Sequence, residues 1–193
     1  MFIAALVGVL ALAVGFGAGL FTAHPSYPGD DSAEAGFARD MSVHHGQAVS
    51  MAIEEYRVTK DESLEQLTVD MALTQQGQIG IMQTWLTNWG LESNGSERPM
   101  TWMDAPVGEG ELMPGMPSED ERTKLRNATG KDKDVLFCQL MMRHHLGGIH
   151  MADGVLDRTD NEQVRDLATK VKNAQQYEIG ALKEKLTALG ATP

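Results

Sequence analysis

The chain repeats itself at an offset of 100 residues, and this repeat constrains its fold more than any other feature. The stretch MSVHHGQAVSMA at residues 41–52 is matched by MMRHHLGGIHMA at residues 141–152. The register then holds without a gap to Gly90 and Gly190, where a helix is expected to end. Because each copy of an internal repeat forms the same supersecondary unit, one structural unit is predicted to occur twice.

Each copy is predicted to be an αα-hairpin, in which a helix, a short turn and a longer helix follow one another. The apolar residues of the second helix recur at spacings of three and four, as they do on one helix face. These stripes are Leu67, Met71, Ile79, Met82, Leu86 and Trp89, and Leu167, Val171, Ile179, Leu182, Leu186 and Leu189. A T-x-x-E pattern at Thr59 and at Thr159 predicts a capping box that opens each second helix.

The predicted fold class is all-α, because one hairpin cannot cover both of its apolar faces and two related hairpins can pack as a four-helix bundle. We expect the hairpins to span residues 35–90 and 131–190. Residues 91–130, rich in Met, Pro and Gly, are expected to connect them. Within this connection, SEDE at residues 118–121 predicts a short capped helix that runs to about Ala128.

The first 23 residues contain no charged side chain, and about 20 apolar residues are enough to cross a bilayer as a helix. We predict an N-terminal transmembrane anchor, with a cleaved signal peptide as the alternative. Residues 24–34 are then a linker. The acidic part of the chain that follows the anchor is expected to lie on the extracytoplasmic side of the membrane.

Charge and cysteine content exclude several classes of function. A formal net charge of -11 repels phosphate backbones, so nucleic acid is not an expected partner. The one cysteine, Cys138, excludes an internal disulfide framework and a Cys-rich zinc or iron–sulfur site. Histidine, methionine and carboxylate remain as possible metal ligands.

The repeated motif has the form M-x-x-H-H-x5-M, which gathers imidazole and thioether groups on a helix. His44 and Met51 are seven residues apart and share a helix face with Met41, which precedes His44 by three. Most helical methionines fill a core, and Met71 and Met82 are expected to do so. An imidazole buried beside apolar neighbours is costly without a partner, so the repeated units indicate a functional site.

The two histidines of each pair are not equivalent, because adjacent helix residues point about 100° apart. A surface position for one member of each pair is therefore open. We favour His44 and His144 as ligands over His45 and His145.

The donor types indicate which metal is expected. Imidazole binds several transition metals, whereas thioether sulfur is soft and selects Cu(I), so the combination favours copper. A di-iron bundle would need glutamates three residues before its histidines. Those positions hold Met41, Ser42, Met141 and Met142, which disfavours a ferritin-like oxidase.

Three other features each have two interpretations. Gln75 and Gln175 interrupt the apolar stripes at matched positions, either as partners that orient a ligand imidazole or as residues at the bundle rim. Cys138 is either a further donor or inert core. The connection carries MTWM at residues 100–103 and MPGM at residues 113–116, which are either a mobile thioether site or packing.

The segments FARDMSVHHGQAVSMA and MPGMPSEDERTKLRNATGKDKDVLFCQLMMRHHLGGIHMA resemble the two signature segments of the family named domain of unknown function 305. This resemblance covers roughly residues 35–190. It implies a ferritin-like four-helix bundle, exported or membrane-anchored, in a family with several copper-linked members. The ligands it implies are Met41, His44, His45, Met51, Met141, His144, His145, Met151, Met113 and Met116.

The expected function is that of a membrane-anchored, extracytoplasmic protein that binds copper as Cu(I) for buffering, resistance or delivery and catalyses no reaction. The metal ion and the membrane are its expected partners. The alternative is an accessory subunit of a membrane protein complex, such as a respiratory assembly, with no essential metal.

Overall fold

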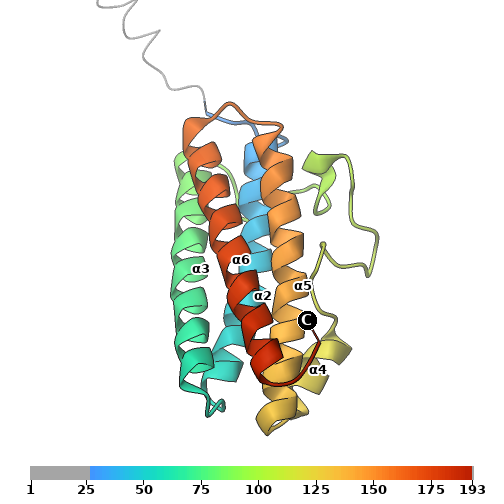
Figure 1. The fold of residues 1–193 in the computed structure, drawn as a ribbon. Helices are drawn as coiled ribbons and strands as arrows, with labels where there is room; N and C mark the ends of the chain where they lie inside the picture. The colour runs from blue at the N-terminus through green and yellow to red at the C-terminus, as the bar shows by residue number, and fades with distance from the viewer. Residues whose placement is uncertain (1–26, 193) are drawn as a thin grey trace, which may run out of the picture.

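The computed structural model describes residues 27–192. All regular secondary structure in this part of the chain is helical (Figure 1). The all-α prediction is confirmed. The predicted anchor at residues 1–23 lies outside the described residues, and within them no helix has the length and apolar content to span a membrane. The elements are α2 (Ala33–Tyr56), α3 (Glu62–Asn88), the 3-10 helix η1 (Thr101–Met103), α4 (Glu119–Asn127), α5 (Gly130–Leu156) and α6 (Glu162–Ala188).

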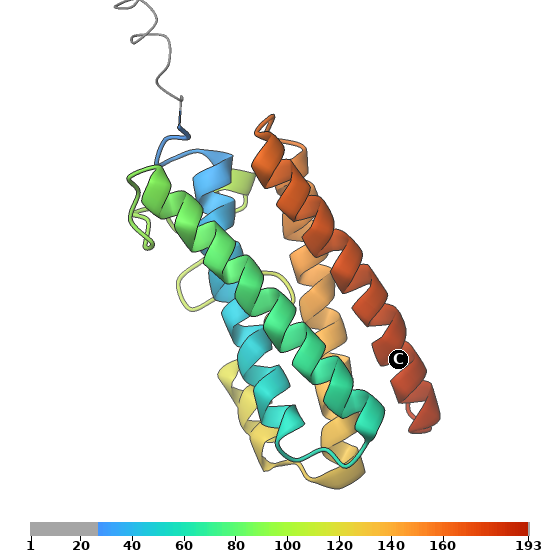
Figure 2. The ribbon, with the colours of Figure 1, turned by 90° about the vertical axis from the view of Figure 1, so that its left-hand side faces the viewer.

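The four long helices form two antiparallel hairpins, α2 with α3 and α5 with α6. The hairpins meet along α2 and α5, which run in opposite directions (Figure 1). In contrast, α3 and α6 lie on the outside and contact each other little (Figure 2). The first helices of the two copies therefore form the centre of the bundle, and these are the helices that carry the paired histidines.

The predicted capping boxes at the start of the second helices are wrong. The N-cap residues are Asp61 and Asn161, whose side chains accept hydrogen bonds from the first-turn backbone N–H groups. Thr59 and Thr159 instead accept a hydrogen bond from the backbone N–H two residues later. The acceptors at positions 61 and 161 adjoin the helix start and so satisfy its free N–H groups more directly.

The other predicted helix ends are confirmed. Ser118 and Glu121 form a reciprocal capping box at the start of α4, which ends before Ala128. Gly90 and Gly190 follow α3 and α6 with φ values of 72° and 68°. This left-handed conformation favours glycine because it has no Cβ.

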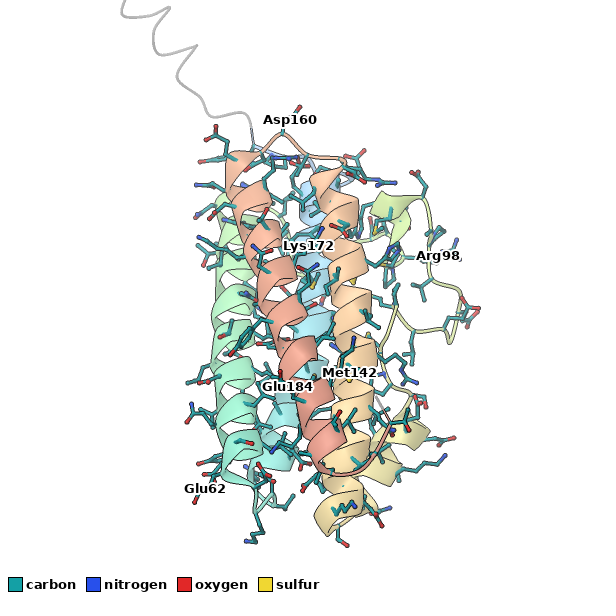
Figure 3. The ribbon with its side chains drawn as sticks, viewed as in Figure 1. Glu62, Arg98, Met142, Asp160, Lys172 and Glu184 are labelled. Carbon is teal, nitrogen blue, oxygen red and sulfur yellow. The ribbon has the colours of Figure 1, made fainter. Side chains whose placement is uncertain are left out.

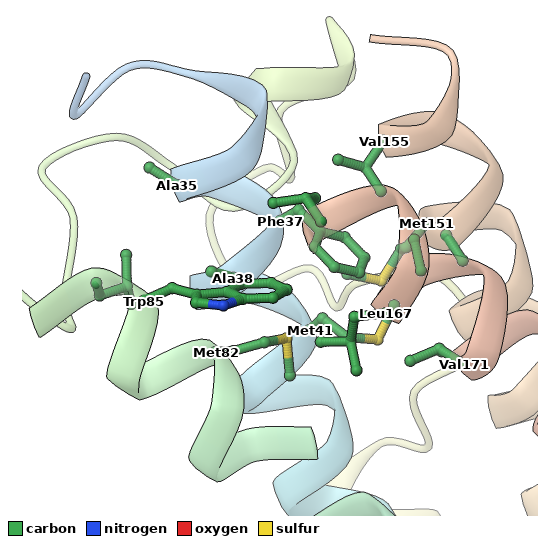
Figure 4. Packing of buried hydrophobic residues seen from close by; sticks show 14 of the residues in the cluster. Ala35, Phe37, Ala38, Met41, Met82, Trp85, Met151, Val155, Leu167 and Val171 are labelled. Carbon is green, nitrogen blue, oxygen red and sulfur yellow. The ribbon is translucent and has the colours of Figure 1, made fainter. Parts of the chain in front are cut away.

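The core consists of two apolar clusters, one towards each end of the bundle. Figure 4 shows the first, in which Phe37 and Met41 pack with Met82 and Met151. The second contains Phe137, Met51, Met71 and Met141. Because the two copies run antiparallel, equivalent residues lie in opposite clusters, and Met41 shares its cluster with Met151 rather than with Met141. The core role predicted for Met71 and Met82 is confirmed.

Charged side chains cover the outer faces of the helices, as Glu62 and Glu184 illustrate (Figure 3).

The connection between the hairpins is held against the bundle by hydrogen bonds to a buried carboxylate. Asp40 accepts hydrogen bonds from the backbone N–H of Met100 and from Nε1 of Trp102, both at 2.7 Å. Glu121 and Arg143 add a two-pronged ion pair with both distances at 2.7 Å. The connection therefore lies along the side of the bundle and is packed against it.

Candidate metal centre

The four paired histidines are all fully buried, with no exposed side-chain surface. The alternative that one member of each pair faces solvent is therefore wrong. Adjacent helix residues do point in different directions, but neighbouring helices cover both directions. His44 and His144 face each other across the α2–α5 contact, whereas His45 and His145 face the second helices of their own hairpins.

His44 and His144 form the central contact between the two copies. Their ring centroids lie 3.8 Å apart with an angle of 36° between the rings. Nε2 of His44 lies 3.0 Å from the carbonyl oxygen of Pro114, so it carries the proton and donates, which leaves Nδ1 with the lone pair. That Nδ1 and both ring nitrogens of His144 have no hydrogen-bond partner among the described residues. Buried polar atoms normally have a hydrogen-bond partner, and these three nitrogens have none among the described residues. They are therefore available to a ligand.

Three of the four imidazoles, those of His44, His45 and His144, are held in the neutral form that binds metals. Burial lowers the pKa of His44 to about 4. Burial, together with the neighbouring His44, lowers the pKa of His45 to about 3. The pKa of His144 is also lowered well below its usual value, mainly by burial and then by His44. At neutral pH the nitrogen lone pairs are therefore available without the loss of a proton.

His45 and His145 have polar partners that the sequence analysis did not identify. Nε2 of His45 donates to Oε1 of Gln78 at 2.7 Å, and Nε2 of His145 donates to Oε2 of Glu178 at 2.6 Å. Nδ1 of each ring has no partner in the described part of the chain. The available signal was a second polar residue at matched positions, three residues after Gln75 and Gln175.

The four motif methionines are fully buried, but they do not lie equally near the central pair. Met41 and Met141 precede His44 and His144 by three residues, which is about 4.5 Å along the helix axis. Met51 and Met151 follow them by seven residues, about 10 Å along the axis. Along the helix axis, Met41 and Met141 are therefore the motif methionines nearest to the imidazole pair.

The MPGM segment of the connection covers one side of the central pair. Besides the contact of Pro114 with His44, Gly115 lies against the backbone of residues 143–144. Met113 is buried in the first apolar cluster, and Met116 packs against that cluster. This position favours the packing interpretation of the segment, and it places two further thioethers beside the residue that contacts His44.

We expect Gly147→Ala to detach the MPGM segment. A Cβ at Gly147 would lie 1.9 Å from the backbone oxygen of Pro114, a contact that only a backbone shift can relieve. Overpacking of this kind typically costs about 1–3 kcal/mol of unfolding free energy. The measurement is urea denaturation of the full chain in mild detergent.

Gly46→Ala is the matched control for this substitution. Gly46 lies within α2, and a Cβ there would meet nothing within 4 Å. Alanine should therefore stabilise the helix by about 0.5–1 kcal/mol, because glycine loses more backbone freedom on folding. Equal stabilities of the Gly147→Ala and Gly46→Ala proteins would show that Gly147 does not seat the segment.

The remaining open features are resolved in part. Gln75 and Gln175 are each 2% exposed, so the rim interpretation is wrong, and both polar atoms of each amide lack a partner among the described residues. Their role in orienting a ligand imidazole stays a prediction. Burial and the nearby Glu55 raise the pKa of Cys138 to about 12, which keeps the thiol protonated and favours the inert-core interpretation.

The candidate centre is a mixed set of donors. Across residues 27–192, no three side chains of the types His, Cys, Asp and Glu come together as a ligand group. The fold brings together the imidazoles of His44 and His144, and Met41 and Met141 are buried about one turn away on the same two helices. The free ring nitrogens and neutral donors of this set fit a soft, singly charged ion such as Cu(I).

Comparison with known proteins identifies a family that matches most of the chain. The family model described as domain of unknown function (DUF305) matches residues 34–186. The chain has no match among curated proteins.

Solved structures of this family share the fold. A DUF305 protein from Streptomyces coelicolor, provisionally described as secreted, is 43% identical with a TM-score of 0.79, and the match covers 85% of this chain and 98% of that one. A DUF305 fragment from Deinococcus radiodurans is 28% identical with a TM-score of 0.67, and the match covers 82% of this chain and 95% of that one.

The fold is also shared with CopM, which has been solved in a Cu(I)-bound form. CopM is 22% identical with a TM-score of 0.60, and the match covers 81% of this chain and 96% of CopM. Further CopM structures contain Cu(II) or Ag. At this identity the likeness shows a common fold.

Proposed function

Since the chain belongs to the DUF305 family, we propose that it binds Cu(I) and buffers the ion or hands it on outside the cytoplasm. The observation that carries this proposal is the contact between His44 and His144 across the two copies, with ring nitrogens that have no other partner among the described residues. The ion is cargo in this proposal, and no reaction is assigned to the protein.

His44 and His144 would supply nitrogen donors, and Met41 and Met141 would supply sulfur. All four side chains are fully buried and uncharged, which suits a soft ion with a single charge. A divalent ion would bring twice the charge into a site whose donors do not compensate it, and buried charge without compensation is costly. The proposed selectivity for Cu(I) over Zn(II) follows from this difference.

The other predicted ligands have secondary places in the proposal. Met51 and Met151 lie about two helical turns from the pair, and we assign them to the ends of a path along the bundle axis. Met113 and Met116, on the segment that contacts His44, would receive or release the ion. His45 and His145, whose rings bond to residues of the second helices, would support the pair.

The comparisons support the proposal at the level of the family. CopM, which shares the fold, has been solved with Cu(I) and with Ag, and both metals favour soft ligands. The provisional description of the Streptomyces coelicolor protein as secreted supports a location outside the cytoplasm. A ferritin-like bundle, anchored to a membrane by residues 1–23, completes the proposed architecture.

A competition titration tests the proposed function. The full chain, purified in mild detergent without oxygen, is titrated against a coloured Cu(I) chelator of known affinity. We expect the protein to withdraw Cu(I) from the chelator, and an excess of Zn(II) to leave this binding unchanged. A chelator that keeps all of its Cu(I), or Zn(II) that displaces Cu(I), would contradict the proposal.

A further inference from the structure

The two copies differ in charge at the residue that contacts the second histidine of each pair. His45 donates to the neutral amide of Gln78 at 2.7 Å, whereas His145 donates to the carboxyl group of Glu178 at 2.6 Å. Gln78 is 9% exposed and Glu178 is 7% exposed, so both partners are buried. The duplicated geometry is therefore the same in both copies, but the charge is not.

Glu178 is the one carboxylate that hydrogen-bonds to a histidine in the part of the chain that the structure describes. The other buried acidic groups are engaged elsewhere. Asp40 binds the backbone of Met100 and the indole of Trp102, and Glu55 lies near Cys138. Gln75 and Gln175, which are buried three residues before Gln78 and Glu178, are neutral amides.

A monovalent cation bound by His44 and His144 would add one positive charge to the buried region around them. The proposed donors of the cation carry no negative charge to offset it. A buried carboxylate beside the cluster compensates that charge. A carboxylate that accepts from Nε2 of a histidine also fixes the lone pair on Nδ1 and makes that nitrogen a stronger donor. An amide at the same place fixes the ring but adds no charge.

We propose that Glu178 is the counter-charge of the metal centre and acts on it through His145, whose ring centroid lies 6.3 Å from that of His144. This inference rests on the proposed function. It makes the second copy the half of the centre that carries the compensating charge. Glu178 acts through His145 and is a positioning residue.

Because positions 78 and 178 are equivalent in the repeat, their residues can be exchanged between the two copies. Glu178→Gln gives the second copy the residue of the first, and Gln78→Glu does the reverse. Partners of metal-binding histidines typically change affinity by about 10–100-fold when they are replaced. We expect Glu178→Gln to weaken Cu(I) binding of the full chain by this factor, measured by chelator competition. The double exchange should recover most of the affinity, because the carboxylate then supports His45.

A spectroscopic readout separates this role from a purely structural one. The full chain, labelled with ¹⁵N in its histidines, is titrated with Ag(I), a diamagnetic ion with the charge of Cu(I). In the wild type the Nδ1 resonance of His145 should shift before that of His45, and in the double exchange this order should reverse. Helical circular dichroism of each variant confirms that it is folded.

The possible results distinguish the two proposals. If the wild type binds neither Cu(I) nor Ag(I), both the proposed function and this inference fail. If the wild type binds but Glu178→Gln binds equally well, or if His45 and His145 shift together, only the role of Glu178 is overturned. A weaker single variant, a recovered double exchange and a reversed order of shifts support it.

Discussion

Replacing His44 and His144 together by glutamine is expected to lower the Cu(I) affinity of the full chain by at least about 100-fold. The two rings contribute the free nitrogens at the contact between the copies. Loss of two direct donors should exceed the 10–100-fold effect that is typical when only the partner of a ligand is lost. Glutamine suits the test because its amide can still donate to the carbonyl of Pro114, as His44 does.

Controls for this variant come from the same protein. His150 lies on α5 like His144 but is exposed, so His150→Gln should leave Cu(I) affinity unchanged. Met71→Leu removes a buried thioether from the second apolar cluster, outside the repeated motif, and should also be neutral. Met41→Leu with Met141→Leu should weaken binding. If the folded protein with both His44→Gln and His144→Gln bound Cu(I) with full affinity, the assignment of the site would be wrong.

Acidification from pH 7 to pH 5 is expected to destabilise the metal-free protein by roughly 4 kcal/mol, a large share of the 5–15 kcal/mol typical of a domain. Burial lowers the pKa values of His44 and His45 to about 4 and about 3, and it also lowers that of His144. The unfolded chain therefore binds protons below pH 6.5 that the folded protein does not bind. The free energy of unfolding therefore decreases as the pH falls through 6.5. It continues to decrease until the pH reaches the pKa values of the folded protein.

A group of opposite sign limits this loss. Burial, with help from Asp134, raises the pKa of Glu55 to about 8, so the folded protein binds an extra proton between about pH 4.5 and 8. This contribution grows as the pH falls and cancels the effect of about one histidine. The net slope is then that of two histidines, each on the order of 1.4 kcal/mol per pH unit.

Chemical denaturation between pH 7.5 and 4.5 measures the slope. His144→Gln should make the stability profile shallower by about 1.4 kcal/mol per pH unit below pH 6. Met71→Leu, which removes no ionisable group, should leave the slope of the profile as it is. A wild-type stability that stays flat down to pH 5 would mean that the buried imidazoles take up protons without unfolding.

Most of the fold follows from local rules that the sequence displays. The 100-residue repeat and the helical spacing of apolar residues predict two hairpins, and the long helices occupy those segments. Glycines 90 and 190 end helices because left-handed backbone favours that residue. The capping residues were missed because Thr59 and Asp61 are both good acceptors, and only the backbone path decides which of them lies at the helix start.

The candidate centre could be predicted by residue type but not by pairing. Spacing along a helix places Met41 and Met51 with His44, yet it cannot say that α2 meets α5 antiparallel. That arrangement brings His44 against His144, and it places Met41 in one apolar cluster with Met151 and Met141 in the other with Met51. Likewise, no local pattern links Gln78 or Glu178 to a histidine 33 residues away, because that contact depends on how each hairpin closes.

Anomalous diffraction at the copper edge, from crystals of the full chain loaded with Cu(I), tests the central claim most directly. The account predicts a copper peak within bonding distance of a ring nitrogen of His44 or His144 and of at least one thioether from Met41 or Met141. Copper found only at exposed groups such as His150, with no anomalous signal beside the ring nitrogens of His44 and His144, would contradict it.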